Sequence, residues 1–224
     1  MPTLKIAAQM DPLDRIDIKG DSTFAILLEA QKRGHDIFYY TPPNLALHGD
    51  KLLARGHTLK VKDKYGDHYA LSNPRTVDLG QLDCVLLRQD PPFDMGYITT
   101  THLLERIHPK TLVVNDPAHV RNAPEKLWVL DFLDLMPPTM VTRQLEDVLS
   151  FRAKYKDIII KPLYGNGGAA VFRIKPEDGN VSSLVELFQT VFREPFMVQE
   201  FRPEVTAGDK RIILVDGEIA GAIN

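Results

Sequence analysis

The chain has 224 residues, of which 44% are hydrophobic and 25% are charged, and its formal net charge at pH 7 is -3. This is the composition of a globular protein, and the charge excludes a general attraction to nucleic acid or anionic lipid. The one cysteine, Cys84, excludes an internal disulfide framework. No segment approaches the roughly 18 apolar residues of a membrane span and the N-terminus has no signal-peptide pattern, so we expect a cytoplasmic protein.

The first forty residues predict a strand, a helix and a second strand. Residues 4–10 and 35–40 are short apolar strands. Between them, Asp21 caps a helix that ends at Gly34, a residue that tolerates the left-handed turn at a helix end. One face of this helix carries apolar residues at helical spacing: Phe24, Ala25, Leu27 and Leu28. A strand–helix–strand unit of this length indicates a parallel sheet.

A hairpin and two buried strands follow. Residues 58–62 and 68–72 alternate polar and apolar side chains, which predicts an antiparallel pair. Residues 82–87 and 111–115 are nearly continuous apolar runs, as in parallel strands that are buried on both faces. Residues 97–108 lie between these two strands and are expected to form a helix that ends before a proline.

The pattern of the sequence changes near residue 122. The second part predicts a helix from residue 122, strands at 139–142, 157–162, 169–174 and 196–201, helices at 145–155 and 182–192, and a terminal hairpin with its turn at Asp216-Gly217. We therefore predict an α/β protein. Residues 1–122 are expected to form a Rossmann-like parallel-sheet domain, and an α+β domain is expected to follow it.

The most informative segment joins a lysine to a glycine-rich turn. Lys161 ends an apolar strand shortly before Gly165-Asn166-Gly167-Gly168. Glycines let backbone N–H groups approach an anion closely, and a lysine adds a positive point charge. The order differs from that of a P-loop, in which the lysine follows the glycines, and from the spacing of a dinucleotide fingerprint. The segment indicates an anion site, with an ordinary hairpin loop as the alternative.

Two further segments could join this site. Lys126 lies at the start of a predicted helix, where a solvated surface lysine is the alternative explanation. Gln199-Glu200-Phe201 end a predicted strand, and their polar side chains and free backbone groups could hydrogen-bond the flat edge of a base. An ordinary sheet edge would give the same sequence.

Charged residues also begin the last hairpin. Arg211 offers a guanidinium fork that suits a carboxylate or phosphate, and Asp209 lies beside it, although a charged strand start is a common feature. The seven histidines form no metal-spaced pair, so we predict no metal site in this chain. No Ser-His-Asp or Cys-His arrangement indicates a covalent nucleophile.

Taken in order, these groups resemble the ATP-grasp ligases, and among them the bacterial glutathione synthetases. The resemblance runs the whole length of the chain and is most specific at residues 18–22 (Ile-Lys-Gly-Asp-Ser) and 88–94 (Arg-Gln-Asp-Pro-Pro-Phe-Asp). It implies a pre-ATP-grasp substrate domain at 1–122 and the central ATP-grasp subdomain at 123–201. Residues 202–224 would begin the C-terminal ATP-grasp subdomain, which would be incomplete.

The resemblance also implies a role for each group. Two lysines would bind the ATP phosphates, a mobile loop would close over them, and a strand end would meet adenine and ribose. Arg211 is the implied catalytic residue and would hold the γ-glutamylcysteine substrate, and the loop at 88–94 would face the cleft. The residues implied to bind ATP are Lys126, Lys161, Gly165, Asn166, Gly167, Gly168, Gln199, Glu200, Phe201 and Asp209.

The implied reaction joins γ-glutamylcysteine to glycine through an acyl phosphate and gives glutathione, ADP and phosphate. Family members continue beyond Asn224, where the Mg²⁺ ligands are expected. The resemblance therefore implies a truncated chain that is inactive alone, and a homo-oligomer when complete. Within the small loop, Tyr164 and Asn166 depart from the expected residues. Two alternatives stay open: a non-catalytic nucleotide- or partner-binding remnant, and another ATP-grasp carboxylate–amine ligase.

Overall fold

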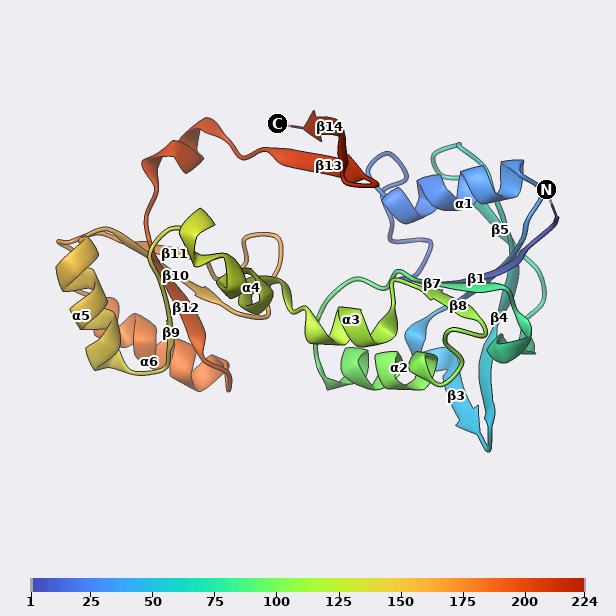
Figure 1. Cartoon of the computed structure of the whole chain (residues 1–224), viewed down its shortest axis with the longest axis horizontal. Coiled ribbons are helices and arrows are strands. Elements are labelled where there is room, and N and C mark those ends of the chain that lie inside the picture. Colours follow the sequence, from blue (N-terminus) through green and yellow to red (C-terminus); the bar gives the residue numbers. More distant parts are fainter. Residues whose placement is uncertain (1, 224) are drawn as a thin grey trace. The chain divides into compact units, whose positions relative to one another are not determined.

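The computed structural model describes residues 2–223 (Figure 1). The chain divides into two compact units, the first ending at Trp128 and the second beginning at Val129. Within residues 2–223, no helix combines the length and the apolar character needed to cross a membrane.

The first unit is built on an eight-stranded mixed sheet with the path β3-β4-β2-β1-β7-β8, and β5 and β6 also pair with β4. Its strands are β1 (Lys5–Gln9), β2 (Asp36–Tyr40), β3 (Leu45–His48), β4 (Lys51–Val61), β5 (Tyr69–Leu71), β6 (Arg75–Asp78), β7 (Cys84–Leu87) and β8 (Leu112–Val114). β1 runs parallel to β2 and β7, and β7 runs parallel to β8. This arrangement confirms the predicted parallel sheet.

Hydrophobic clusters cover both faces of this sheet. Alternate residues of β1 divide between them: Ile6 and Ala8 belong to the cluster that includes Phe24 of helix α1 (Ser22–Lys32), and Ala7 belongs to the other. The second cluster includes Leu104 of helix α2 (Met95–Glu105). Because side chains alternate along a strand, the central strands are buried on both faces, as the continuous apolar runs predict.

Asp21 caps α1 as predicted, and its carboxylate accepts a hydrogen bond of 2.7 Å from the Phe24 backbone N–H. The expectation that Ala25 belongs to the apolar face is wrong, because Ala25 is exposed. Residues that share one face of a helix recur every three to four positions, and the buried residues of α1 follow this spacing without including position 25. Its members are Thr23, Phe24, Leu27 and Ala30.

The sequence prediction missed the antiparallel extension of this sheet and one short helix. β4 begins at Lys51, well before the predicted strand, and a turn at Gly49, whose φ is +63°, joins it to β3. Helix α3 (Pro117–Asn122) was also missed, although Asp116 caps it and Pro117 occupies its first position. Helix α4 (Glu125–Trp128) then ends the first unit, and both α4 and α3 are short.

The second unit contains a four-stranded antiparallel sheet with the order β11-β10-β12-β9. Its elements are β9 (Thr139–Thr142), helix α5 (Leu145–Tyr155), β10 (Ile158–Pro162), β11 (Phe172–Ile174), helix α6 (Val181–Val191) and β12 (Phe196–Glu200). A separate two-stranded sheet follows, with β13 (Arg211–Val215) and β14 (Glu218–Ile223). The predicted bounds of α5 are confirmed.

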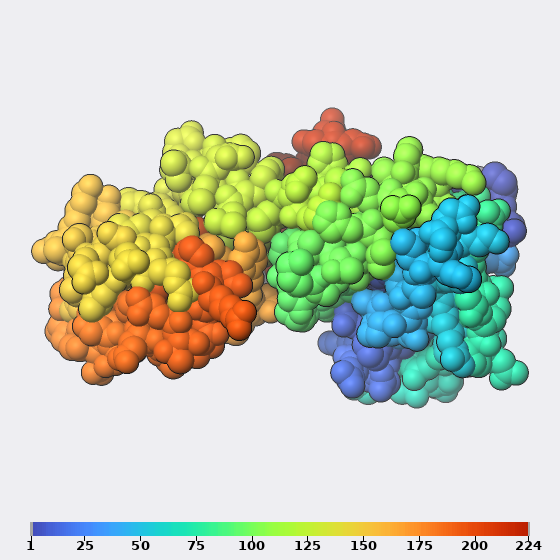
Figure 2. Space-filling model, turned by 90° about the horizontal axis from the view of Figure 1, so that it is seen from below, coloured from blue at the N-terminus to red at the C-terminus, as the bar shows by residue number. Residues whose placement is uncertain are grey.

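Helices α5 and α6 cover one face of the four-stranded sheet (Figure 1). Phe151 of α5 and Phe188 of α6 belong to one cluster with Ile158 and Ile160 of β10 and Val198 of β12. Figure 2 shows the outer surface of this part of the chain, in yellow and orange. Because successive side chains of a strand point to opposite faces, the residues of β10 and β12 that alternate with these buried ones lie on the other face of the sheet.

The strand predicted at 169–174 is shorter than expected, because β11 begins only at Phe172. Gly167, Gly168 and Ala170 have φ angles of +60°, +75° and +55°, which a β-strand does not use. The terminal hairpin forms as predicted: Asp216 and Gly217 both have positive φ, as a type I′ turn requires.

Candidate functional site

The face of the four-stranded sheet that α5 and α6 leave uncovered, here called the open face, carries a row of four side chains. Strand register places Arg173 of β11, Ile159 of β10, Gln199 of β12 and Thr139 of β9 side by side. The Gln199 side-chain amide donates to Thr139 Oγ1 at 2.8 Å, and this bond links two strands. The open face thus presents aliphatic and hydrogen-bonding groups together.

Lys161 lies on the same face, one pleat further along β10. It pairs in register with Met197 of β12, which pairs with Val141 of β9. The lysine is half-buried, whereas Ile160 next to it is completely buried in the helix-covered core. The alternation of β10 therefore orients the ammonium toward the open face, and the glycine-rich loop begins shortly after it.

The glycine-rich loop has a backbone that side chains would disturb. A Cβ atom on Gly165 would lie 2.9 Å from Pro162 Cγ, so the chain folds back closely on the end of β10. Gly167 and Gly168 have positive φ and open space around them. Asn166, whose carbonyl accepts from Ala169 N at 3.2 Å, is exposed, as are Gly167 and Gly168. An exposed loop of this kind can present backbone N–H groups to an anion.

The strand end at Gln199-Glu200-Phe201 differs in one respect from the sequence prediction. Its backbone N–H groups are not free: Glu200 N donates to Pro138 O at 3.1 Å, and Phe201 N donates to Asp157 O at 2.9 Å. The sheet holds β12 on both sides to its last residue, so these donors are used internally. Side chains rather than these N–H groups are left to recognise a base.

Three predicted site residues lie elsewhere in the chain. Lys126 belongs to α4 in the first unit and is half-buried. Asp209 lies in the loop before β13, and Arg211 is the first residue of that strand; both are exposed. The structure thus brings Lys161 and Gln199 onto one face of one sheet, and it puts these three residues on separate elements.

A second polar cluster lies at the carboxyl ends of β1 and β7 in the first unit. Arg88, directly after β7, donates from Nε to Thr23 Oγ1 at 3.0 Å and from Nη2 to Ser22 Oγ at 2.8 Å. Its guanidinium therefore joins the end of the sheet to the start of α1. In open parallel sheets this edge is where ligands bind.

Carboxylates and buried amides complete this second cluster. Asp90 N donates to Asp11 Oδ2 at 2.6 Å, and desolvation together with the charges of Asp11 and Asp21 raises the pKa of Asp90. The side chain of Gln9 is fully buried and donates to Gln89 Oε1 at 2.5 Å. Its own Oε1 has no hydrogen-bond partner in the described part of the chain.

Residues 2–223 contain no group of three or more His, Cys, Asp or Glu side chains that could hold a metal ion. The polar clusters of both units therefore do not fit a Mg²⁺ site by themselves.

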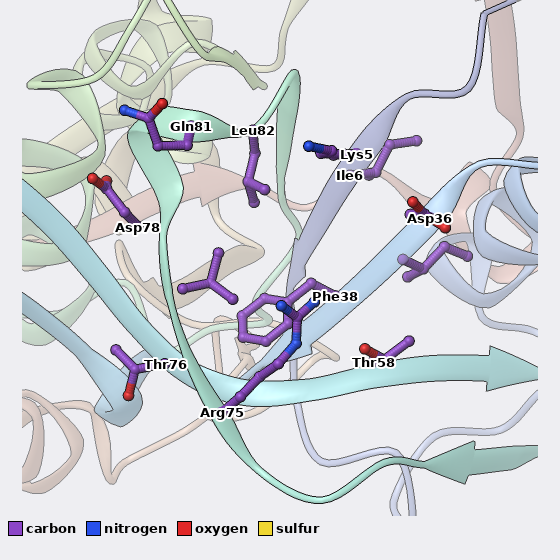
Figure 3. Close-up of a pocket in the computed structure, with 12 residues that line it drawn as sticks. Lys5, Ile6, Asp36, Phe38, Thr58, Arg75, Thr76, Asp78, Gln81 and Leu82 are labelled. Carbon is purple, nitrogen blue, oxygen red and sulfur yellow. The ribbon is translucent and has the colours of Figure 1, made fainter.

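A cavity of about 460 Å³ lies at the opposite, amino-terminal end of β1 and β2. Figure 3 shows Arg75 beside Phe38 at its centre and Lys5 with Asp36 at one end. The Arg75 guanidinium lies 5.4 Å from the centre of the Phe38 ring. Two cations and two carboxylates, including Asp78, line this cavity, so its charge does not select an anion.

Sequence comparisons match both parts of the chain to one family. The model of the prokaryotic glutathione synthetase N-terminal domain matches residues 4–121, and that of the ATP-grasp domain of the same family matches residues 125–224. The chain is 61% identical to a glutathione synthetase of Rhodopseudomonas palustris and covers 71% of its length with 99% of its own. It is 43% identical to one of Vibrio vulnificus, with 96% of the chain covering 68% of that protein.

Solved structures of ATP-grasp proteins share the fold. A D-cycloserine synthetase aligns with 97% of this chain and 66% of its own length at a TM-score of 0.64 and 16% identity. An ATP-grasp protein with a RimK domain from Sphaerobacter thermophilus aligns with 97% of this chain and 71% of its own, at a TM-score of 0.62 and 21% identity. The chain belongs to the prokaryotic glutathione synthetase family, which consists of ATP-dependent carboxylate–amine ligases with the ATP-grasp fold.

Proposed function

We propose that the open face of the β9–β12 sheet binds ATP, and that the protein uses this ATP to join γ-glutamylcysteine to glycine. The observation that carries the proposal is the strand register. It sets a lysine, Lys161, and the polar side chains of Gln199 and Thr139 on the face that α5 and α6 leave uncovered, with a glycine-rich loop shortly after the lysine. A nucleotide needs these elements together: a surface for the base, and cations with backbone donors for the phosphates.

Each group has a distinct proposed role. Gln199, Glu200 and Phe201 meet adenine and ribose, with Ile159 as an apolar surface beneath the base. Lys161 neutralises phosphate charge, and Lys126 is proposed for the same role. Residues 165–168 close over the phosphates and limit the access of water, because a reactive acyl phosphate would otherwise be hydrolysed.

The chemistry follows from the weakness of a carboxylate as an electrophile. An oxygen of the γ-glutamylcysteine carboxylate attacks the γ-phosphorus of ATP, the bond to the bridging oxygen breaks, and ADP leaves. The glycine amine then attacks the acyl carbon, and phosphate leaves with the bonding electron pair while the amine loses a proton. Cations and backbone N–H groups fixed at the phosphates stabilise the charge that moves during transfer. No covalent bond to the protein forms.

The second polar cluster is the proposed contact for the peptide substrate. Arg88 is fixed by Ser22 and Thr23 at the carboxyl edge of the parallel sheet, where a guanidinium can hold a carboxylate. We assign Arg211 to the same substrate, and Asp209 to the nucleotide. These residues come from exposed segments whose side chains are available to a ligand.

Titration calorimetry tests the proposal. We expect saturable, one-to-one binding of ADP that ATP displaces, and separate saturable binding of γ-glutamylcysteine. Absence of ADP binding would contradict the proposal. ADP binding with no affinity for γ-glutamylcysteine, but with affinity for D-alanine or glutamate, would instead indicate another ligase of the same superfamily.

A further inference from the structure

Arg173 connects two parts of the chain that meet at the end of β12. Its Nε lies 3.0 Å from Asp157 Oδ1 and its Nη2 lies 2.6 Å from Asp157 Oδ2, so the guanidinium binds the carboxylate through two parallel hydrogen bonds. The same guanidinium lies 3.6 Å from the centre of the Phe201 ring. One planar group is therefore paired with a carboxylate at its edge and stacked on an aromatic ring at its face.

Asp157 holds the same segment by a second route. Its backbone carbonyl accepts the hydrogen bond from Phe201 N at 2.9 Å, while its carboxylate binds Arg173. The hydrogen bond from Arg173 is the main reason that the pKa of Asp157 is lowered, so the carboxylate stays ionised. Phe201 is thereby fixed at its backbone by Asp157 and at its ring by Arg173.

Stability alone is a weak reason for this arrangement. The Arg173 side chain is 41% exposed and that of Asp157 is 28% exposed, and ion pairs in such positions contribute little to folding. The arrangement does, however, restrict the Phe201 ring, which sits at the end of the strand that carries Gln199. A ring held in one orientation loses less freedom when a ligand packs on it.

We propose that Arg173 is a positioning residue for the base of the nucleotide. Its guanidinium, paired with Asp157, stacks on the Phe201 ring and so holds the segment 199–201 in the conformation that binds a purine. Arg173 acts through Phe201 and does not need to touch the phosphates. This inference rests on the proposed function, in which residues 199–201 meet the base. It goes beyond that function in making base affinity depend on a residue of β11, at the far end of the row across the open face.

The test separates the base from the phosphates. Calorimetry compares the binding of ADP with that of inorganic tripolyphosphate, which has no base, for the unchanged chain and for Arg173→Met. We expect ADP binding to weaken by about fivefold to tenfold and tripolyphosphate binding to stay unchanged, since only the stacked and paired guanidinium is lost. Arg173→Lys keeps the charge but not the planar fork, and we expect it to resemble Arg173→Met.

Arg143 supplies the matched control. Its guanidinium donates to the carbonyls of Gln189, Phe192 and Glu194, so Arg143→Met should lower the unfolding temperature without changing the ratio of the two affinities. Equal weakening of ADP and tripolyphosphate by Arg173→Met, or no weakening of either, would overturn the inference. If Arg173→Met does not fold, Arg173→Lys and Asp157→Asn decide by the same ratio. Absence of ADP binding by the unchanged chain would overturn the proposed function, and this inference with it.

Discussion

The two large sheets of this chain differ in how many of their faces are covered. The parallel part of the first sheet is packed with hydrophobic side chains on both faces, whereas the four-stranded sheet is covered by α5 and α6 on one face only. A sheet buried on both sides can offer a ligand only its edges and strand ends. A sheet that helices cover on one side only can also offer side chains from within its other face.

The polar residues of each unit follow this difference. In the first unit they gather where β1 and β7 end, around Arg88 and Asp90. In the second they lie within the strands, at Lys161 and Gln199, in positions that a doubly covered sheet would have to fill with apolar side chains. We therefore expect substitutions on the covered face of β10 to affect mainly stability and those on its open face to affect ADP binding. Substitutions at the edge of the first sheet should affect the binding of γ-glutamylcysteine.

The largest difference should separate two neighbouring isoleucines of β10. Ile160 is fully buried against α5 and α6, so Ile160→Ala should lower the free energy of unfolding by about 2–5 kcal/mol. Ile159 lies half-buried on the open face, and Ile159→Ala should cost about 1 kcal/mol of stability. Only Ile159→Ala should weaken ADP binding in a folded variant. Urea unfolding and calorimetry measure both effects; equal loss of stability in the two variants would contradict the difference between the faces.

The next effect concerns charge on the open face. Lys161→Gln should weaken ADP binding by about 10- to 100-fold, since a charged hydrogen bond to phosphate is lost. Lys126→Gln should also weaken it. Lys154→Gln removes the same charge from α5, where the ammonium lies 5.0 Å from the centre of the Tyr155 ring, and should leave ADP binding unchanged. Similar losses for Lys161→Gln and Lys154→Gln would show that net charge, rather than position, sets the affinity.

A smaller effect is expected at the edge of the first sheet. Arg88→Met leaves the hydroxyls of Ser22 and Thr23 without their guanidinium donors, at a cost of about 1–2 kcal/mol in unfolding free energy. It should weaken the binding of γ-glutamylcysteine and leave ADP binding unchanged. Arg33→Met, which removes an exposed pair with Glu29, is the control and should change neither affinity. Weaker ADP binding in Arg88→Met would mean that the two polar clusters do not have separate ligands.

The smallest effects are pH-dependent and have opposite signs in the two units. Because the fold raises the pKa of Asp90, the ionised carboxylate costs stability, and Asp90→Asn should stabilise the chain at neutral pH. This gain should disappear as the pH falls through the raised pKa. The pKa of Asp157 is lowered, so its contribution is present above the unfolded pKa and lost as the pH falls through the folded one. Asp157→Asn should therefore destabilise the chain at neutral pH. Chemical unfolding from acidic to neutral pH measures the stability of both variants, and a change of the same sign in Asp90→Asn and Asp157→Asn would contradict this prediction.

Local signals predicted much of this fold because they act over a few residues. The apolar spacing of residues 145–155 and the Asp216-Gly217 turn each contain their own physical cause, and both elements form as expected. The strand expected from residue 169 does not form there because Ala170 has a positive φ, which alanine seldom takes. The antiparallel extension around β4 was missed although Gly49-Asp50 separates two apolar runs, a turn signal that could have been used.

The sequence indicated candidate site residues but not the surface on which some of them lie together. That Lys161 and Gln199 share a face depends on the register between β10 and β12, which no local pattern determines. The expectation that the N–H groups at 199–201 are free was wrong for the same reason, because their acceptors come from distant segments. The contacts of Arg173 were missed because its partners lie sixteen residues before it, at Asp157, and directly after β12, at Phe201.

The claim that the open face binds the nucleotide can be tested directly by photolabelling with 8-azido-ADP, followed by mass spectrometric mapping of the modified peptides. The reactive group sits on the base, so we expect the label within residues 157–174 or 196–201, and excess ADP should prevent it. If α5 or α6, on the covered face, carries the label and excess ADP prevents this labelling, the claim is contradicted.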